Sequence, residues 1–266
     1  MQATLPIGVF DSGVGGLTVL HALTDLLPNE SVLYLGDTAR VPYGTKSAAV
    51  VEAYALRCAG FLVNQGAKAI VIACNTASAV AVESIRREFN IPVVGVIGPG
   101  AEVACQSTTN GRIGIMGTQG TIQSGAYQAA IELKRPGSIV LGQACPLLVP
   151  LAEEDLVDHA AARLLAQDYL KPLLEADIDT LVLGCTHYPL FKELLSELAG
   201  PEIQIIDSAT AVADAVHKEL TAHTLINSNK SPATKRIFAT DWGQRFEQVG
   251  SRFLGAALPQ VEHVGL

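Results

Sequence analysis

Two short segments of this chain follow the same pattern, and together they restrict the folds that the chain can adopt. Residues 70–74 read IVIAC and residues 181–185 read LVLGC. Each is a continuous apolar run, as is typical of a parallel strand covered on both faces. Each ends in a cysteine followed by a polar turn, at Asn75-Thr76 and at Thr186-His187. The pattern predicts two equivalent strand ends, each carrying a thiol.

Other landmarks show that a whole unit is repeated. Residues 7–10 match 113–116 and residues 93–96 match 203–206, in the same order as the cysteine runs and at a spacing of about 110 residues. Strand-like runs alternate with helical stretches, which favours parallel sheets flanked by helices. We therefore predict an α/β fold of two pseudo-symmetric doubly wound domains, each with a mainly parallel sheet. Because ligands bind beyond the carboxyl ends of such strands, we expect the active site in the cleft between the domains.

The repeat also predicts the domain boundaries. We expect residues 1–98 and 208–266 to form the first α/β domain, and residues 99–207 to form the second. The first domain is discontinuous because the C-terminal segment has no counterpart in the repeat. That segment is expected to pack back and complete the first sheet.

Composition excludes several classes of protein. The net charge of −8, without a cluster of lysine or arginine, argues against a nucleic-acid partner. No apolar run is long enough to cross a membrane and the first residues do not form a signal peptide, so we expect a cytoplasmic protein with reduced thiols. The five cysteines form no CxxC pair, so neither a disulfide framework nor a metal site is predicted.

A single cysteine after a strand is usually a small buried hydrophobic residue. The repeat and the polar turns favour a functional interpretation for Cys74 and Cys185. Cys58, Cys105 and Cys145 lack such surroundings, and we interpret them as structural or incidental.

Two thiols on opposite sides of a substrate could remove a proton from one face and return one to the other. Proton abstraction at the α-carbon of an amino acid usually needs a cofactor such as pyridoxal phosphate, which forms a Schiff base with lysine. Lysines are few here and none lies in a strand-end motif, so no cofactor is expected. Asp11 and His187, beside the two strand ends, are candidates to assist the thiols.

The strand-end loops supply the remaining candidates. Backbone N–H groups and the Ser12 hydroxyl could bind an anion, and the alternative is a tight turn with Asp11 as a helix cap. The functional interpretation is favoured because Asp11 is expected at the same sheet edge as Cys74. Asn75-Thr76 could hold a carboxylate or act as helix caps, and the matching Thr186-His187 pair favours a carboxylate cradle. His187 could also be an ordinary loop histidine. Glu153 could pair with His187, or could be one of three acids at the start of a helix predicted over 157–175. Four further candidates for substrate binding lie in loops that resemble ordinary turns: Tyr43, Gly44, Thr118 and Thr121.

Longer motifs carry a family resemblance. Residues 8–17 read GVFDSGVGGL, 34–44 read YLGDTARVPYG, 73–78 read ACNTAS and 184–190 read GCTHYPL, with DSA at 207–209. In these motifs the chain resembles the glutamate racemases of the cofactor-independent aspartate/glutamate racemase superfamily. The HYP sequence after Thr186 and the DSGVGG sequence from Asp11 favour glutamate over aspartate as the substrate.

The resemblance implies interconversion of L- and D-glutamate, supplying D-glutamate for peptidoglycan, by an enzyme that is often a homodimer. It implies that Cys74 deprotonates the D enantiomer with help from Asp11. Cys185 would deprotonate the L enantiomer with help from His187, behind which Glu153 would lie. The residues that would hold the substrate are Asp11, Ser12, Tyr43, Gly44, Asn75, Thr76, Thr186 and His187.

Other functions stay open at this point. An aspartate or hydantoin racemase would share both cysteine runs. A two-lobed protein that binds a dicarboxylate without chemistry would need the polar cradle but not the thiols. A zinc or redox protein is a weaker alternative, because no second ligand lies at metal spacing from either cysteine.

Overall fold

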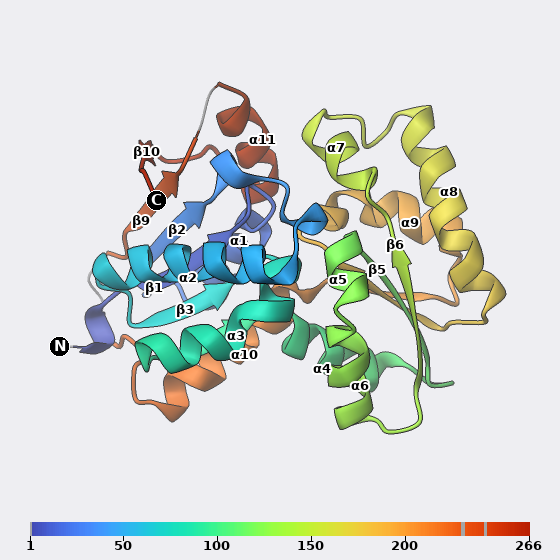
Figure 1. Ribbon diagram of the computed structural model, residues 1–266, viewed down its shortest axis with the longest axis horizontal. Helices are drawn as coiled ribbons and strands as arrows, with labels where there is room; N and C mark the ends of the chain where they lie inside the picture. Colours follow the sequence, from blue (N-terminus) through green and yellow to red (C-terminus); the bar gives the residue numbers. More distant parts are fainter. Residues whose placement is uncertain (1, 230–231, 242–243) are drawn as a thin grey trace. The chain divides into compact units, whose positions relative to one another are not determined.

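The computed structural model describes residues 2–229, 232–241 and 244–266, with no side-chain description for residues 244 and 245 (Figure 1). The chain divides into two compact units. The first unit comprises Met1–Val96 and Ala209–Leu266, and the second comprises Ile97–Ser208. Each unit is built around its own sheet, in which every pairing is parallel.

The sheet of the first unit has the strand order β10-β9-β2-β1-β3-β4. Its strands are β1 (Ile7–Asp11), β2 (Val32–Gly36), β3 (Ala69–Ile72), β4 (Val93–Gly95), β9 (Lys235–Ala239) and β10 (Val261–His263). Its helices are α1 (Leu17–Leu26), α2 (Ala48–Asn64), α3 (Asn75–Phe89), α10 (Ser208–Ala222) and α11 (Gln244–Leu254). Because β9 pairs with β2, the C-terminal segment extends this sheet.

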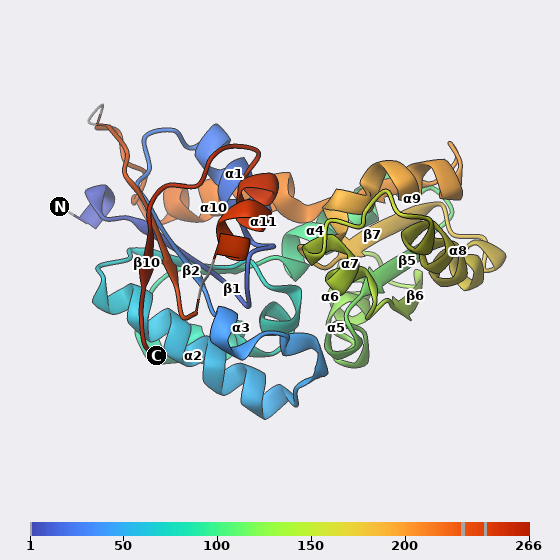
Figure 2. The same cartoon turned by 90° about the horizontal axis from the view of Figure 1, so that it is seen from above.

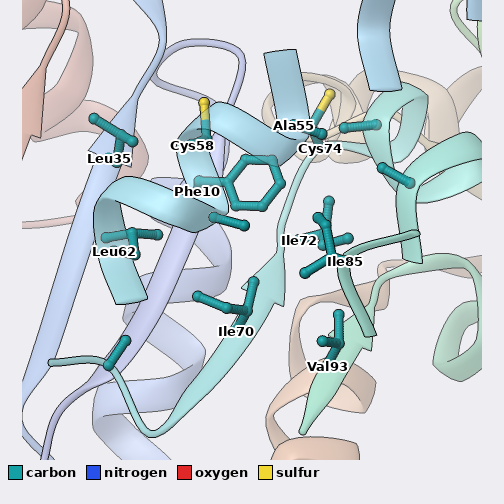
Figure 3. Close-up of a cluster of buried hydrophobic side chains, with 14 of the residues drawn as sticks. Phe10, Leu35, Ala55, Cys58, Leu62, Ile70, Ile72, Cys74, Ile85 and Val93 are labelled. Carbon is teal, nitrogen blue, oxygen red and sulfur yellow. The ribbon is translucent and has the colours of Figure 1, made fainter. Parts of the chain in front are cut away.

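Helices cover both faces of the first sheet. In Figure 2, α2 and α3 lie on one side of the strands, and α1 and α11 lie on the other. Apolar side chains fill the layer between the strands and the α2–α3 pair. Figure 3 shows this layer, where Phe10, Ile70 and Ile72 from the strands lie near Leu62 of α2 and Ile85 of α3. Because both faces of these strands are buried, polar and apolar residues do not alternate along them.

The second unit repeats this arrangement on a smaller scale. Its strands are β5 (Arg112–Gly117), β6 (Ile139–Ala144), β7 (Thr180–Gly184) and β8 (Gln204–Ile206), in the order β6-β5-β7-β8. Its helices are α4 (Ile97–Ser107), α5 (Gln119–Gln123), α6 (Ala126–Lys134), α7 (Leu148–Glu153), α8 (Ala160–Glu175) and α9 (Lys192–Ala199). The order matches β2-β1-β3-β4 of the first unit, so the predicted α/β fold with a duplicated parallel sheet is confirmed.

One sequence expectation about helices was wrong. Glu153, Glu154 and Asp155 do not lie at the start of a helix: Glu153 ends α7, Glu154 is its C-cap, and Asp155 has a φ of 60°. The following helix begins only at Ala160, where the Nδ1 atom of His159 accepts a hydrogen bond from the N–H of Ala161.

Three helices, α4, α7 and α9, were not predicted. Two of them, α4 and α7, contain proline, which is typical of loops. Pro99 and Pro150 each stand at the third residue of their helix. In the first turn a missing N–H costs no intrahelical hydrogen bond, so proline is tolerated there. The short strand β10 was also not predicted.

The carboxylate of Asp179 joins the start of β7 to the loop that follows α4. It accepts hydrogen bonds from the Thr108 hydroxyl (2.6 Å), the Thr109 N–H (2.7 Å) and the Asn110 N–H (2.7 Å). Burial acts to raise the pKa of Asp179, but these hydrogen bonds outweigh it and hold the pKa well below the ordinary 3.8.

We therefore expect Asp179→Asn to lower the free energy of unfolding at pH 7 by about 1–3 kcal/mol. A carboxylate with a depressed pKa stabilises the fold above its unfolded pKa, and this stability is lost as pH falls toward the folded pKa. The difference from wild type, measured by urea unfolding, should therefore shrink at pH 3.5. Asp177→Asn, at a neighbouring exposed position, is the control and should have little effect. An equal loss at both pH values would contradict this account.

Candidate functional site in two strand-end clusters

The first cluster lies at the carboxyl ends of β1, β2 and β3. Asp11 is the last residue of β1 and pairs in register with Gly36 of β2, while Cys74 follows β3 after one intervening residue. Because neighbouring parallel strands end at the same edge of the sheet, the fold brings these positions together. Cys74 is also the N-cap of α3, where the helix dipole stabilises negative charge.

A direct contact links the Asp11 turn to Cys74. The Cys74 thiol lies 3.6 Å from the Ser12 hydroxyl oxygen, to which it donates. The turn is closed by the Gly13 N–H, which donates to Asp11 Oδ2 at 2.9 Å. Asp11, Ser12 and Cys74 are all buried. The structure therefore brings these three candidate residues together at the carboxyl ends of β1 and β3.

Glycine is required at position 16 by close packing. A Cβ atom there would lie 2.6 Å from the Cβ of Asp11 and 2.8 Å from that of Ala73. The glycine-rich turn thus lets the start of α1 approach the two strands that carry Asp11 and Cys74. Asn75 and Thr76 occupy the first turn of α3 next to the thiol, and both are buried.

Tyr43 lies in a short 3₁₀ helix, Tyr43–Thr45, which also contains Gly44. Its buried hydroxyl donates to Asp37 Oδ2 at 2.5 Å. Asp37 also accepts from Arg40 Nη1 at 3.0 Å and from the Thr240 hydroxyl at 2.9 Å. Sequence reasoning missed Asp37, although a carboxylate directly after the β2 run was the same signal that singled out Asp11.

The second cluster lies at the carboxyl end of β7. Cys185 follows this strand directly, and its backbone oxygen accepts a hydrogen bond from the Tyr188 N–H at 3.1 Å. Thr186 and His187 lie within that turn and are buried. The Cys185 sulfur is 3.9 Å from His187 Nδ1, and His187 Nε2 is 3.0 Å from Glu153 Oε1.

This order of contacts sets the proton positions on the histidine. An ionised carboxylate can only accept, so the Nε2 atom facing Glu153 carries hydrogen. In the neutral ring, Nδ1 then presents its lone pair to the Cys185 thiol and can take its proton. Glu153 comes from α7, and its side chain is 32% exposed against 4% for His187.

Thr118 and Thr121 stand at the end of β5, beside β7. Thr118 is the N-cap of α5 and accepts from the Thr121 N–H at 3.2 Å, and the two hydroxyl oxygens are 3.0 Å apart. Gly117 pairs with Gly184, so these threonines share the strand-end edge that carries Cys185.

The other cysteines have different surroundings. Burial raises the pKa of the Cys58 thiol, and the charge of Asp37 raises it further. Burial, followed by the proximity of Cys185, raises the pKa of Cys145. Both thiols therefore stay protonated and unreactive at neutral pH.

Within the described ranges, no group of three or more histidine, cysteine or acidic side chains is placed to hold a metal ion. No helix in the same part of the chain combines the length and apolar character needed to cross a membrane.

Comparisons with known proteins agree on one family. The family model described as Asp/Glu/Hydantoin racemase matches residues 9–216. The glutamate racemase of Syntrophus aciditrophicus is 52% identical over 261 residues, covering 98% of this chain and 97% of its own. That of Geobacter metallireducens is 50% identical over 260 residues, covering 98% and 96%.

A solved structure leads to the same family. The crystal structure of glutamate racemase from Francisella tularensis in complex with D-glutamate matches with a TM-score of 0.93 and 37% identity, covering 99% of this chain and 98% of the other. Agreement of the family model, near-full-length relatives and the fold shows that this chain belongs to the Asp/Glu/Hydantoin racemase family and is an amino-acid racemase.

Proposed function

We propose that this protein interconverts L- and D-glutamate by cofactor-independent proton transfer at the α-carbon, with Cys74 and Cys185 as the two bases. One observation carries the proposal: a buried thiol follows the equivalent strand in each unit, and polar or titratable side chains lie beside it. Glutamate is favoured as the substrate because the near-full-length relatives are glutamate racemases and the Francisella tularensis structure holds D-glutamate.

In the proposed reaction, a thiolate on one face removes the α-hydrogen as a proton, and its electron pair stays on the α-carbon. The thiol on the other face then donates its proton to that carbon and becomes the thiolate. One C–H bond breaks and one forms, so the substrate inverts with no net change in charge. Cys74 acts on D-glutamate and Cys185 on L-glutamate.

The neighbours of Cys185 suit this exchange. Neutral His187 can accept the Cys185 proton through Nδ1, and the resulting imidazolium is stabilised by Glu153 at Nε2. Beside Cys74, the start of α3 stabilises the thiolate, and the carboxylate of Asp11 at the adjacent strand end assists proton transfer.

The cradle for the substrate is proposed from the polar groups around each thiol. The N–H groups at the start of α3 and the hydroxyls of Ser12, Thr76 and Thr186 are suited to carboxylate oxygens. Tyr43 and Gly44 contribute from their 3₁₀ helix, but the Tyr43 hydroxyl already donates to Asp37. Further proposed contacts come from Asp11, Asn75, Thr118, Thr121 and His187.

The cellular setting is part of the same proposal. A cytoplasmic enzyme of this kind would supply D-glutamate for peptidoglycan and would act as a homodimer. Light scattering across a concentration series would measure the oligomeric state, and a monomer at all concentrations would contradict the dimer.

Incubation of each glutamate enantiomer in deuterated water tests the reaction. Early in the reaction, the product of opposite hand should carry one α-deuterium while the remaining substrate keeps its hydrogen, because a different thiol serves each face. Chiral chromatography with mass spectrometry measures both, and D- and L-aspartate serve as the comparison substrates.

Failure to convert either glutamate enantiomer would exclude the proposed activity. Deuterium appearing equally early in substrate and product would exclude a separate base for each face. Faster turnover of aspartate would overturn the proposed substrate.

A further inference from the structure

A buried tyrosine hydroxyl in each unit donates to a backbone carbonyl of a loop beside the thiol. Tyr34 of β2 donates to the Gly13 carbonyl at 2.8 Å. Tyr188, which begins the 3₁₀ helix Tyr188–Phe191, donates to the Cys145 carbonyl at 2.7 Å. Both side chains belong to fully buried residues. Neither tyrosine takes part in the proton transfer proposed above.

In the first unit, the Gly13 residue connects Tyr34 to the Cys74 cluster. Its carbonyl accepts from Tyr34, while its N–H donates to the Asp11 carboxylate at 2.9 Å. The adjacent Ser12 hydroxyl accepts from the Cys74 thiol. A shift of the Gly13 carbonyl would therefore move both groups that flank the thiol.

Glycine at position 36 permits this close approach. A Cβ atom there would lie 2.6 Å from the Gly13 carbonyl oxygen. The loop thus packs directly on β2, and its carbonyl is within reach of Tyr34 on that strand. The arrangement leaves the Asp11 turn little room to adjust.

In the second unit, the Cys145 carbonyl lies just before α7. It accepts from the Tyr188 hydroxyl and also from the Leu148 N–H at 3.2 Å, at the start of that helix. The last residue of α7 is Glu153, which binds His187. Tyr188 also donates its own N–H to the Cys185 carbonyl. One residue therefore ties the turn of the thiol to the helix that holds the partner of His187.

We propose that Tyr34 and Tyr188 are positioning residues, one for each thiol, that hold the assisting groups in place through the Gly13 and Cys145 carbonyls. Their effect on turnover rests on the proposed racemase function, whereas their effect on the thiols does not.

The surroundings of both tyrosine hydroxyls keep them protonated, so each can always act as a hydrogen-bond donor. Burial raises the pKa of Tyr34 well above its ordinary range, and negative charge at Asp11 and Cys74 raises it further. Burial raises the pKa of Tyr188 likewise, followed by charge at Cys185 and Cys145. Both hydroxyls therefore keep their proton throughout the pH range in which the enzyme can be assayed.

The test compares Tyr34→Phe with Tyr188→Phe, since each removes one hydroxyl and keeps the ring. Alkylation of each thiol by iodoacetamide is followed against pH by mass spectrometry of the Cys74 and Cys185 peptides. In Tyr34→Phe, the pH profile of Cys74 should move and its rate at neutral pH should change severalfold, while Cys185 keeps its wild-type profile. Tyr188→Phe should give the reverse. Tyr54→Phe, whose ring packs on Tyr43 in the first unit, is the control and should alter neither profile.

Turnover adds a second measurement. Because small displacements of assisting groups slow proton transfer, kcat for racemisation should fall about tenfold in each tyrosine variant, with a smaller change in KM. Thermal unfolding and circular dichroism establish that each variant is folded.

Several results would overturn the proposal. One is equal disturbance of both thiols by either variant, which would indicate general loosening of the fold. Another is two wild-type alkylation profiles together with wild-type kcat. If both variants failed to fold, the hydroxyls would be requirements for folding rather than positioning groups. Absence of racemase activity in the wild-type protein would instead refute the proposed function, and the alkylation profiles would still decide the role of the tyrosines.

Discussion

Replacement of Cys74 or Cys185 by alanine should abolish racemisation, lowering kcat/KM for glutamate by at least about 1000-fold. Each change removes the only group proposed to exchange a proton with one face of the α-carbon. A fall of this size corresponds to about 4 kcal/mol of transition-state stabilisation. Both side chains are small, and each belongs to a residue that is 6% exposed, so the loss of one sulfur should leave the fold intact.

The two variants should differ in what they retain. Cys185→Ala keeps Cys74, so it should exchange the α-hydrogen of D-glutamate with solvent deuterium without inverting it. Cys74→Ala should do the same for L-glutamate alone. Proton NMR of each enantiomer in deuterated water measures this exchange.

Cys105→Ala is the matched control. It removes a thiol of α4, outside the strand-end turns, and should keep wild-type racemisation. Substantial racemisation by either single variant of Cys74 or Cys185 would remove that cysteine from the mechanism. Exchange of the same enantiomer by both variants would overturn the assignment of one thiol to each face.

The second large effect is expected in stability, from a buried ion pair in the first unit. Lys68 Nζ donates to Glu30 Oε2 at 2.5 Å, and the two side chains are 1% and 2% exposed. The same ammonium donates to the Ala3 carbonyl at 2.6 Å and the Leu225 carbonyl at 2.9 Å. Lys68, which directly precedes β3, therefore joins the N-terminal segment, the loop that carries Glu30 and the segment that follows α10.

We expect Lys68→Met to lower the free energy of unfolding by about 3–5 kcal/mol, because it leaves the buried charge of Glu30 without its cation. The Asn227 N–H, which donates to Glu30 Oε1 at 2.8 Å, cannot replace that charge. Urea unfolding followed by circular dichroism measures the change.

An exposed ion pair provides the control. Arg86 and Glu83 are 46% and 76% exposed, so Glu83→Gln should change the stability by less than about 0.5 kcal/mol. The double variant Lys68→Met/Glu30→Leu should recover part of the loss, since no uncompensated charge then remains. A loss below about 1 kcal/mol in Lys68→Met would show that the pair contributes little.

The sequence predicted the strands well because their signal is local. A parallel strand covered on both faces must be apolar at every position, and runs such as residues 70–73 and 181–184 satisfy that requirement. Short helices were harder to predict. Proline in α4 and α7, and glycine in α4, are typical of loops, yet proline in a first turn is compatible with a helix.

The assisting groups could not be inferred from the repeat, because the two units differ there. Asp11 ends β1 opposite Gly36, but the equivalent strand β5 ends in Gly117 opposite Ala144. Because residue 117 is glycine, the second unit has no side chain at the position equivalent to Asp11. An acid near Cys185 must therefore come from elsewhere in the chain, and a repeated pattern cannot say from where.

The sequence by itself determined the fold class, the duplication and the position of both thiols at strand ends, because burial and strand order impose them on neighbouring residues. Only the tertiary structure decided which distant groups meet. Glu153 reaches His187 across 34 residues of sequence, and Tyr34 reaches Gly13 across 21. Such contacts follow from how helices and loops pack on the sheet, since no local spacing in the sequence specifies them.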